Sequence, residues 1–172
     1  AYDQTVIYLY GDPSTPARLA HAGIKVIPLG LCKGQLRGLK KFLHIRRIAR
    51  IIREKQPDII HPQRHKSTVL AVMAARLADS KARILTTVHG EARSRNWRRY
   101  LLNLWILRRL HRIVACSEAV RQDVLRNNSW LPHQKVATIV NGINTAQFAL
   151  SSVSRQDARR EMGLEPIDGV FI

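Results

Sequence analysis

Two histidines follow short apolar runs, a position where chemistry is often placed in an α/β protein. His61 comes after DII at 58–60, and His89 and Gly90 come after ILTTV at 84–88. Such runs predict buried strands, and ligands of open α/β sheets collect outside the carboxyl ends of parallel strands. His89 is therefore the first candidate functional residue. From the residues alone, a structural histidine that caps its strand fits this position as well as a functional one.

The order of apolar runs and helical patterns predicts the fold that would position these histidines. We expect strands at 5–10, 24–29, 58–61, 83–89, 112–116 and 135–140, and helices at 14–22, 35–56, 68–78, 97–110 and 118–126. This alternation is typical of an α/β fold with a Rossmann-like, doubly wound parallel sheet. A short helix at 155–162 and an apolar run at 169–172 follow. The sequence thus predicts one domain over 1–150, and over 151–172 a connection that starts a second domain.

Three of the expected helices carry further information. The helix at 35–56 is amphipathic, and its basic face is more simply explained by solvation than by ligand binding. The helix at 97–110 is too short to span a bilayer, and we expect it to be buried with a partly exposed aromatic edge. Ser117 predicts an N-cap for the helix at 118–126, whose N-terminus could hold an anion. The apolar face of the helix at 35–56 is expected to contain Phe42, Ile45, Ile48, Ala49 and Ile52. Its basic face is expected to contain Lys40, Arg46, Arg47, Arg50 and Arg53.

The charge of the chain is its most unusual compositional feature. The chain has 29 Lys and Arg against 12 Asp and Glu, a formal net charge of +17, and 45% hydrophobic residues. The hydrophobic content indicates a globular protein, and the charge favours nucleic acid, an anionic membrane or a phosphorylated substrate as partner. Cys32 and Cys116 lack the spacing of a zinc site or a disulfide scaffold, and a reducing cytosol is the simplest compartment.

Four segments in succession carry a resemblance to a known family. They are PDIIH at 57–61, ILTTVHG at 84–90, RIVACSEAVRQDVL at 112–125 and KVATIVNGINTAQF at 135–148. In order and spacing the chain resembles the N-terminal, acceptor-side domain of retaining family-4 glycosyltransferases with the GT-B fold. The resemblance extends from about residue 5 to residue 172.

The resemblance implies roles for particular residues. In this family the N-terminal domain binds mainly the acceptor, and a C-terminal domain binds the nucleotide-sugar. His89 matches a histidine close to the transferred sugar, and His61 matches one beside the acceptor pocket. Asn144 stands where the family's NGID crossing has an acid, and Gln63 stands where a second histidine is common.

The candidate site residues follow from the residues and the resemblance together. The catalytic candidate is His89, and neither a metal ion nor another cofactor is expected. The family's first strand with its Gly-rich loop is not found before Thr5, and we expect the chain alone to be inactive. The candidates for substrate binding are His61, Arg64, Lys66, Gly90, Ser117 and Asn141, and those for contact with a membrane or an anionic acceptor are Arg93, Arg95, Arg98 and Arg99.

The expected function is transfer of a sugar with retention from a UDP- or GDP-sugar. The expected acceptor is a lipid-linked, lipopolysaccharide or other envelope glycan, and the expected location is the inner face of the cytoplasmic membrane, as a peripheral protein. One alternative is a non-catalytic, basic nucleic-acid-binding module. Because the aromatic residues lie within an apolar helix and a recognition motif is absent, no nucleic-acid partner is expected. The other alternative, a sugar-nucleotide epimerase of similar fold, is disfavoured by the NGIN segment at 141–144.

Overall fold

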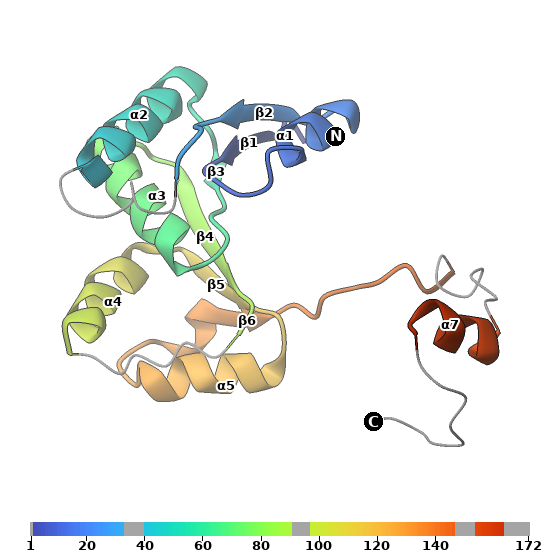
Figure 1. Cartoon of the computed structure of the whole chain (residues 1–172). Coiled ribbons are helices and arrows are strands. Elements are labelled where there is room, and N and C mark those ends of the chain that lie inside the picture. Colours follow the sequence, from blue (N-terminus) through green and yellow to red (C-terminus); the bar gives the residue numbers. More distant parts are fainter. Residues whose placement is uncertain (1, 33–39, 91–96, 147–153, 164–172) are drawn as a thin grey trace. The chain divides into compact units, whose positions relative to one another are not determined.

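The structure is a computed structural model that describes residues 2–32, 40–90, 97–146 and 154–163 (Figure 1). The chain divides into two compact units, Ala1–Ile139 and Val140–Ile172, and each is described by itself. The second unit contains helix α7 (Arg155–Glu161), which Ser154 caps by accepting a hydrogen bond from the backbone N–H of Asp157. The first unit contains all the strands that the structure describes.

The strands of the first unit are paired in parallel throughout. Strands β1 (Thr5–Tyr8) and β2 (Lys25–Pro28) form one pair, whereas β3 (Ile59–Ile60), β4 (Arg83–Val88), β5 (Arg112–Ala115) and β6 (Val136–Thr138) form a four-stranded sheet in that order. The predicted α/β fold with parallel, Rossmann-like topology is confirmed. In the described part of the chain the strands form two separate ladders, because β1 and β3 do not pair with each other.

The helices connect successive parallel strands, as crossover connections require. Helix α2 packs on α3 and α3 on α4, whereas α1 contacts β2, and α5 contacts β5 and β6. Figure 1 shows α2, α3 and α4 in a row along one side of the strands. The helix bounds are α1 Thr15–His21, α2 Lys40–Lys55, α3 His65–Leu77, α4 Trp97–Arg109 and α5 Glu118–Asn127, and a short 3-10 helix, η2, spans His133–Lys135.

The core lies between these helices and the strands. Ile113 of β5 is fully buried, and Ile106 of α4, Leu110 directly after α4 and Val72 of α3 are almost as deeply buried. These residues belong to one apolar cluster that also receives the buried face of α2. The first unit therefore has a single core, which holds the strands in place.

The apolar face predicted for α2 is confirmed except at its first residue. Ile45, Ile48, Ala49 and Ile52 are buried, whereas Phe42 is 52% exposed. Phe42 lies in the first turn of α2, and the ammonium group of Lys41 is 5.9 Å from the centre of its ring. The prediction that Phe42 faces the core is wrong because the apolar stripe reaches the core only from the second turn onward.

The exposure of helix α4 agrees with its sequence pattern. Trp97 and Tyr100 are exposed, whereas Asn103, Ile106 and Leu110 on and beyond the following turns are buried. The aromatic edge is exposed as predicted, but the predicted burial holds only for the second half of α4, because Leu101 and Leu102 in the first half are exposed as well. Among the described residues, none of the helices combines the length and the apolar composition that crossing a bilayer would require.

The central position of Ile113 leads to a first prediction. Ile113→Ala should lower the free energy of unfolding by about 2–5 kcal/mol, because it removes a fully buried side chain that its neighbours cannot replace. Ile139→Ala is the matched control, since Ile139 is 61% exposed, and it should cost less than about 0.5 kcal/mol. Urea unfolding of the two variants measures both values. Equal losses would show that the core is not centred on β5.

Candidate functional site

The parallel register brings three strand ends to one edge of the four-stranded sheet. Val88 of β4 pairs with Ala115 of β5, and beyond β3 the chain continues to an isolated bridge between Gln63 and Thr87. His89 and Ser117 therefore follow neighbouring strands at the carboxyl edge of the sheet. This is the edge at which α/β folds collect ligands.

A hydrogen-bonded cluster of side chains lies at this edge. Oε1 of Gln63 is 2.9 Å from Nε2 of His89, and Nε2 of Gln63 is 3.3 Å from Nε2 of His61. The same nitrogen of His61 is 2.8 Å from the hydroxyl oxygen of Thr87. The two histidines predicted from their strand ends are thus brought together, and Gln63 connects them.

The loop that carries Gln63 is held in place by hydroxyl groups. Oγ1 of Thr86 is 2.8 Å from Oγ1 of Thr68 and 3.1 Å from the carbonyl oxygen of Pro62, and both threonines are buried. Ser67 donates to the carbonyl of Gln63, and Oγ1 of Thr68 is 2.9 Å from the carbonyl of Arg64. The carbonyls of three successive loop residues are therefore satisfied by side chains of β4 and α3.

Helix α3 begins earlier than predicted because of the same hydroxyl contacts to the loop carbonyls. The sequence predicts a helix from residue 68, but α3 begins at His65 and the cap position is Arg64, with φ 71° and ψ 155°. This backbone conformation is one that essentially only glycine adopts without strain. The hydroxyl contacts to the loop carbonyls hold it there, so that Ser67 lies inside the first turn and bonds back to the loop.

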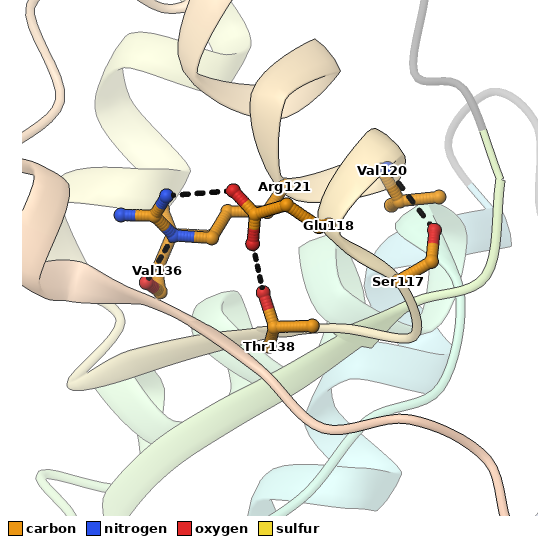
Figure 2. A network of polar contacts seen from close by, with 6 residues as sticks. All are labelled: Ser117, Glu118, Val120, Arg121, Val136 and Thr138. Atoms are coloured by element: carbon orange, nitrogen blue, oxygen red, sulfur yellow. Dashed lines mark hydrogen bonds and ion pairs between the residues drawn. The ribbon is translucent and has the colours of Figure 1, made fainter.

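Ser117 has the capping role that was predicted for it. Its Oγ accepts a hydrogen bond of 3.2 Å from the backbone N–H of Val120, as Figure 2 shows. Beside it, the carboxylate of Glu118 accepts from the hydroxyl of Thr138 at 2.8 Å and from the guanidinium of Arg121 at 3.0 Å. These two hydrogen bonds lower the pKa of Glu118. The N-terminus of α5 thus already holds a negative charge, which opposes binding of a second anion there.

His61 is electrostatically distinct from an ordinary histidine. Burial of its ring lowers its pKa below the usual value, and the nearby His89 lowers it further. His61 is therefore neutral at pH 7, and one of its ring nitrogens remains an acceptor. A neutral imidazole at this edge suits hydrogen bonding to uncharged hydroxyl groups.

The remaining predicted site residues are distributed as follows. Arg64, Lys66 and Gly90 are exposed next to the histidine cluster in sequence. Asn141 is exposed in the second unit and is described only within that unit. Arg98 and Arg99 occupy the first turn of α4, and only their backbone is described, whereas Arg93 and Arg95 lie outside the described residues. Within the described ranges, no group of three or more His, Cys, Asp or Glu side chains is placed to hold a metal ion.

Some contacts of the cluster could not be named from the sequence. The bridging role of Gln63 and the contacts of Thr86 and Thr87 depend on the register of β4 against the loop after β3. A second unexpected contact joins Nε2 of His65 to Oδ1 of the buried Asn103 at 2.9 Å and ties α3 to α4. In the sequence, only the pair of threonines inside an otherwise apolar strand indicated that β4 makes polar contacts.

Comparison with known families identifies the chain. The sequence model of Glycosyltransferase Family 4 matches residues 2–147. The chain belongs to Glycosyltransferase Family 4. No curated protein shows a significant match to the sequence.

Solved structures support the fold of this family-4 chain. A glycosyltransferase from Rickettsia africae ESF-5 is 21% identical with a TM-score of 0.71, and the match covers 94% of this chain and 42% of that protein. Alr3699/HepE from Anabaena, solved in complex with UDP, is 16% identical with a TM-score of 0.66 over 92% of this chain and 42% of its own. The lipopolysaccharide outer core galactosyltransferase WaaB is 15% identical with a TM-score of 0.57, covering 78% of this chain and 34% of its own.

The family-4 chain therefore spans less than half of each of these proteins. A UDP-GlcNAc 2-epimerase from Methanocaldococcus jannaschii has a similar fold, with 12% identity and a TM-score of 0.53 over 79% of this chain and 45% of its own. The fold alone thus does not separate a transferase from an epimerase. The match to the Glycosyltransferase Family 4 model favours the transferase.

The lowered pKa of His61 leads to a second prediction. In an NMR titration His61 should titrate below about pH 6.5, the value of an unperturbed histidine. In His89→Ala the midpoint should rise, because a neighbouring positive charge is removed, but should stay below 6.5 because the ring remains partly buried. His133→Ala, a change at an exposed histidine of η2, should leave the midpoint where it is.

The same shift has a consequence for stability. The unfolded chain binds a proton at His61 at a higher pH than the folded chain, so this residue destabilises the fold as the pH falls below about 6.5. Replacing His61 by Asn should therefore reduce the loss of stability between neutral and mildly acidic pH in urea unfolding. A midpoint at or above 6.5 in the titration would contradict both expectations.

Proposed function

We propose that this chain is the acceptor-binding half of a retaining glycosyltransferase. Residues 1–150 form the acceptor domain, and 151–172 lead into a domain that binds the donor. The enzyme transfers a sugar from a UDP- or GDP-sugar to a lipid-linked, lipopolysaccharide or other envelope glycan. A metal ion is not required for the transfer.

The contact of His61 and His89 through Gln63 is the observation that supports this proposal best. It lies at the carboxyl edge of a parallel sheet in a family-4 chain, and hydroxyl groups hold its loop in place. The structures with similar folds include HepE in complex with UDP and glucose and a lipopolysaccharide galactosyltransferase, which supports a nucleotide-sugar donor and an envelope acceptor.

The site residues act by binding and orienting the substrates. His89 contacts a hydroxyl of the transferred sugar, and His61 contacts the acceptor. In a retaining transfer without an enzyme nucleophile, the rate gain comes mainly from holding the reacting atoms in line and from stabilising the departing diphosphate. Arg64 and Lys66, exposed beside the cluster, would attract a phosphorylated acceptor.

We propose further that the protein is cytoplasmic and bound to the inner face of the cytoplasmic membrane. The net charge of +17 favours anionic lipid, since each Lys or Arg near such a surface contributes about 1 kcal/mol. The first turns of α4 combine exposed Trp97, Tyr100 and Leu101 with Arg98 and Arg99. Aromatic and basic residues on one helix suit the boundary between lipid headgroups and acyl chains.

Removal of the His89 imidazole tests the proposed role of this residue in sugar transfer. In the protein that carries both domains, His89→Ala should lower kcat for sugar transfer about a hundredfold, because a hydrogen bond to the reacting sugar is lost. His89 is exposed, so the melting temperature should change little. His133→Ala, at an exposed histidine far along the chain from the cluster, should retain full activity. An active His89→Ala enzyme would remove His89 from the reaction.

Charge reversal on α4 tests the proposed binding of this helix to an anionic membrane. The double variant Arg98→Glu and Arg99→Glu should bind vesicles containing anionic lipid more than about tenfold less tightly, since two favourable charges become repulsive. The matched control is Arg46→Glu with Arg50→Glu, the same change in net charge on the exposed face of α2. Vesicle sedimentation compares the two. An equal loss in both variants would mean that net charge, and not the α4 surface, determines binding.

A further inference from the structure

The amide of Gln63 is bonded to both histidines of the cluster, and its two ends differ chemically. Its oxygen faces Nε2 of His89 at 2.9 Å, and its nitrogen faces Nε2 of His61 at 3.3 Å. An amide oxygen only accepts hydrogen bonds, and an amide nitrogen only donates them. The two contacts therefore require opposite protonation at the same atom of the two rings.

The hydrogens of both imidazoles follow from this requirement. Nε2 of His89 must carry a proton to donate to the Gln63 oxygen, so in the neutral ring Nδ1 holds the lone pair. Nε2 of His61 must be unprotonated to accept from the Gln63 nitrogen, so in its neutral ring Nδ1 carries the proton. The hydroxyl of Thr87, 2.8 Å from the same nitrogen of His61, then donates as well, and the two donors share the single lone pair of that nitrogen.

The backbone of Gln63 is held in place by its neighbours. Gln63 bridges to Thr87 of β4, and its carbonyl accepts from the hydroxyl of Ser67. The carbonyls on either side of it, those of Pro62 and Arg64, are held by the buried Thr86 and Thr68. The side chain of Gln63 thus starts from a backbone that is anchored at three successive residues.

We propose that Gln63 is a positioning residue that holds the two histidines in complementary tautomers. Among the described residues, none is hydrogen-bonded to Nδ1 of either ring. The pair consequently presents one N–H donor, on His61, and one lone-pair acceptor, on His89. A sugar hydroxyl both donates and accepts, and so matches this pair, whereas a phosphate oxygen can use only the donor.

The naming of a sugar hydroxyl as ligand rests on the proposed function, but the tautomers are a property of this chain alone. They can be read from long-range proton–nitrogen NMR spectra of the 15N-labelled chain, recorded about two pH units above the ordinary histidine pKa of about 6.5. His61→Asn and His89→Asn assign the signals. His61 is the decisive ring, because the neutral side chain of free histidine prefers the proton on Nε2.

We expect His61 to carry its proton on Nδ1, and His89 on Nε2. In Gln63→Leu, His61 should change to the Nε2–H form and donate to Thr87. Gln63→Glu, whose carboxylate only accepts, should cause the same change and serves as a second variant if the leucine protein does not fold. The control Thr87→Val removes the other partner and should leave His61 in the Nδ1–H form. An Nε2–H form of His61 in the unaltered chain, or no change in either Gln63 variant, would overturn the proposal.

A transfer assay on the two-domain protein separates this proposal from the proposed function. Gln63→Leu should lower kcat/KM about tenfold, the size expected for one lost hydrogen bond. The predicted tautomers combined with unchanged transfer would leave the positioning of the rings established and count against their part in catalysis. Strong loss of transfer in His89→Ala, combined with the wrong tautomers, would support the catalytic site and reject the role of Gln63.

Discussion

The pairing of β4 with strands on both of its sides is the constraint on which the candidate site depends. Val88 is aligned with Ala115, and Thr87 is aligned with Gln63. Parallel strands must be joined by crossovers that return the chain to the starting edge, so the residues after β3, β4 and β5 gather at one edge. Two histidines that are distant in sequence become neighbours because of this topology.

The fold was predictable to the extent that its signals are local. Apolar runs mark β4 and β5 to within a residue or two, and Ser117 and Ser154 lie next to the helices that they cap. The start of α3 was not predictable in this way. A serine at position 67 is a good capping residue, yet the loop before it is determined by threonines from α3 and from a strand that comes later in the chain.

The candidate site was predictable in its position and not in its bonding. His61 and His89 could be placed at strand ends from the sequence, because a strand end is visible as the end of an apolar run. The partner of each ring could not, because it depends on the register between β4 and the loop after β3. Phe42 is a similar case on the surface of α2, since periodicity indicates a face and tertiary packing decides how far the core extends along it.

The backbone of Arg64 places stability and function in opposition at one position. Its φ of 71° and ψ of 155° lie in a region that costs about 1–3 kcal/mol for a residue with a side chain. Directed evolution for heat resistance would therefore favour glycine here. Glycine would also remove the guanidinium next to Gln63 in the sequence. It would raise the conformational entropy of the unfolded chain at this segment. Selection for thermostability would thus act on a residue of the proposed binding site.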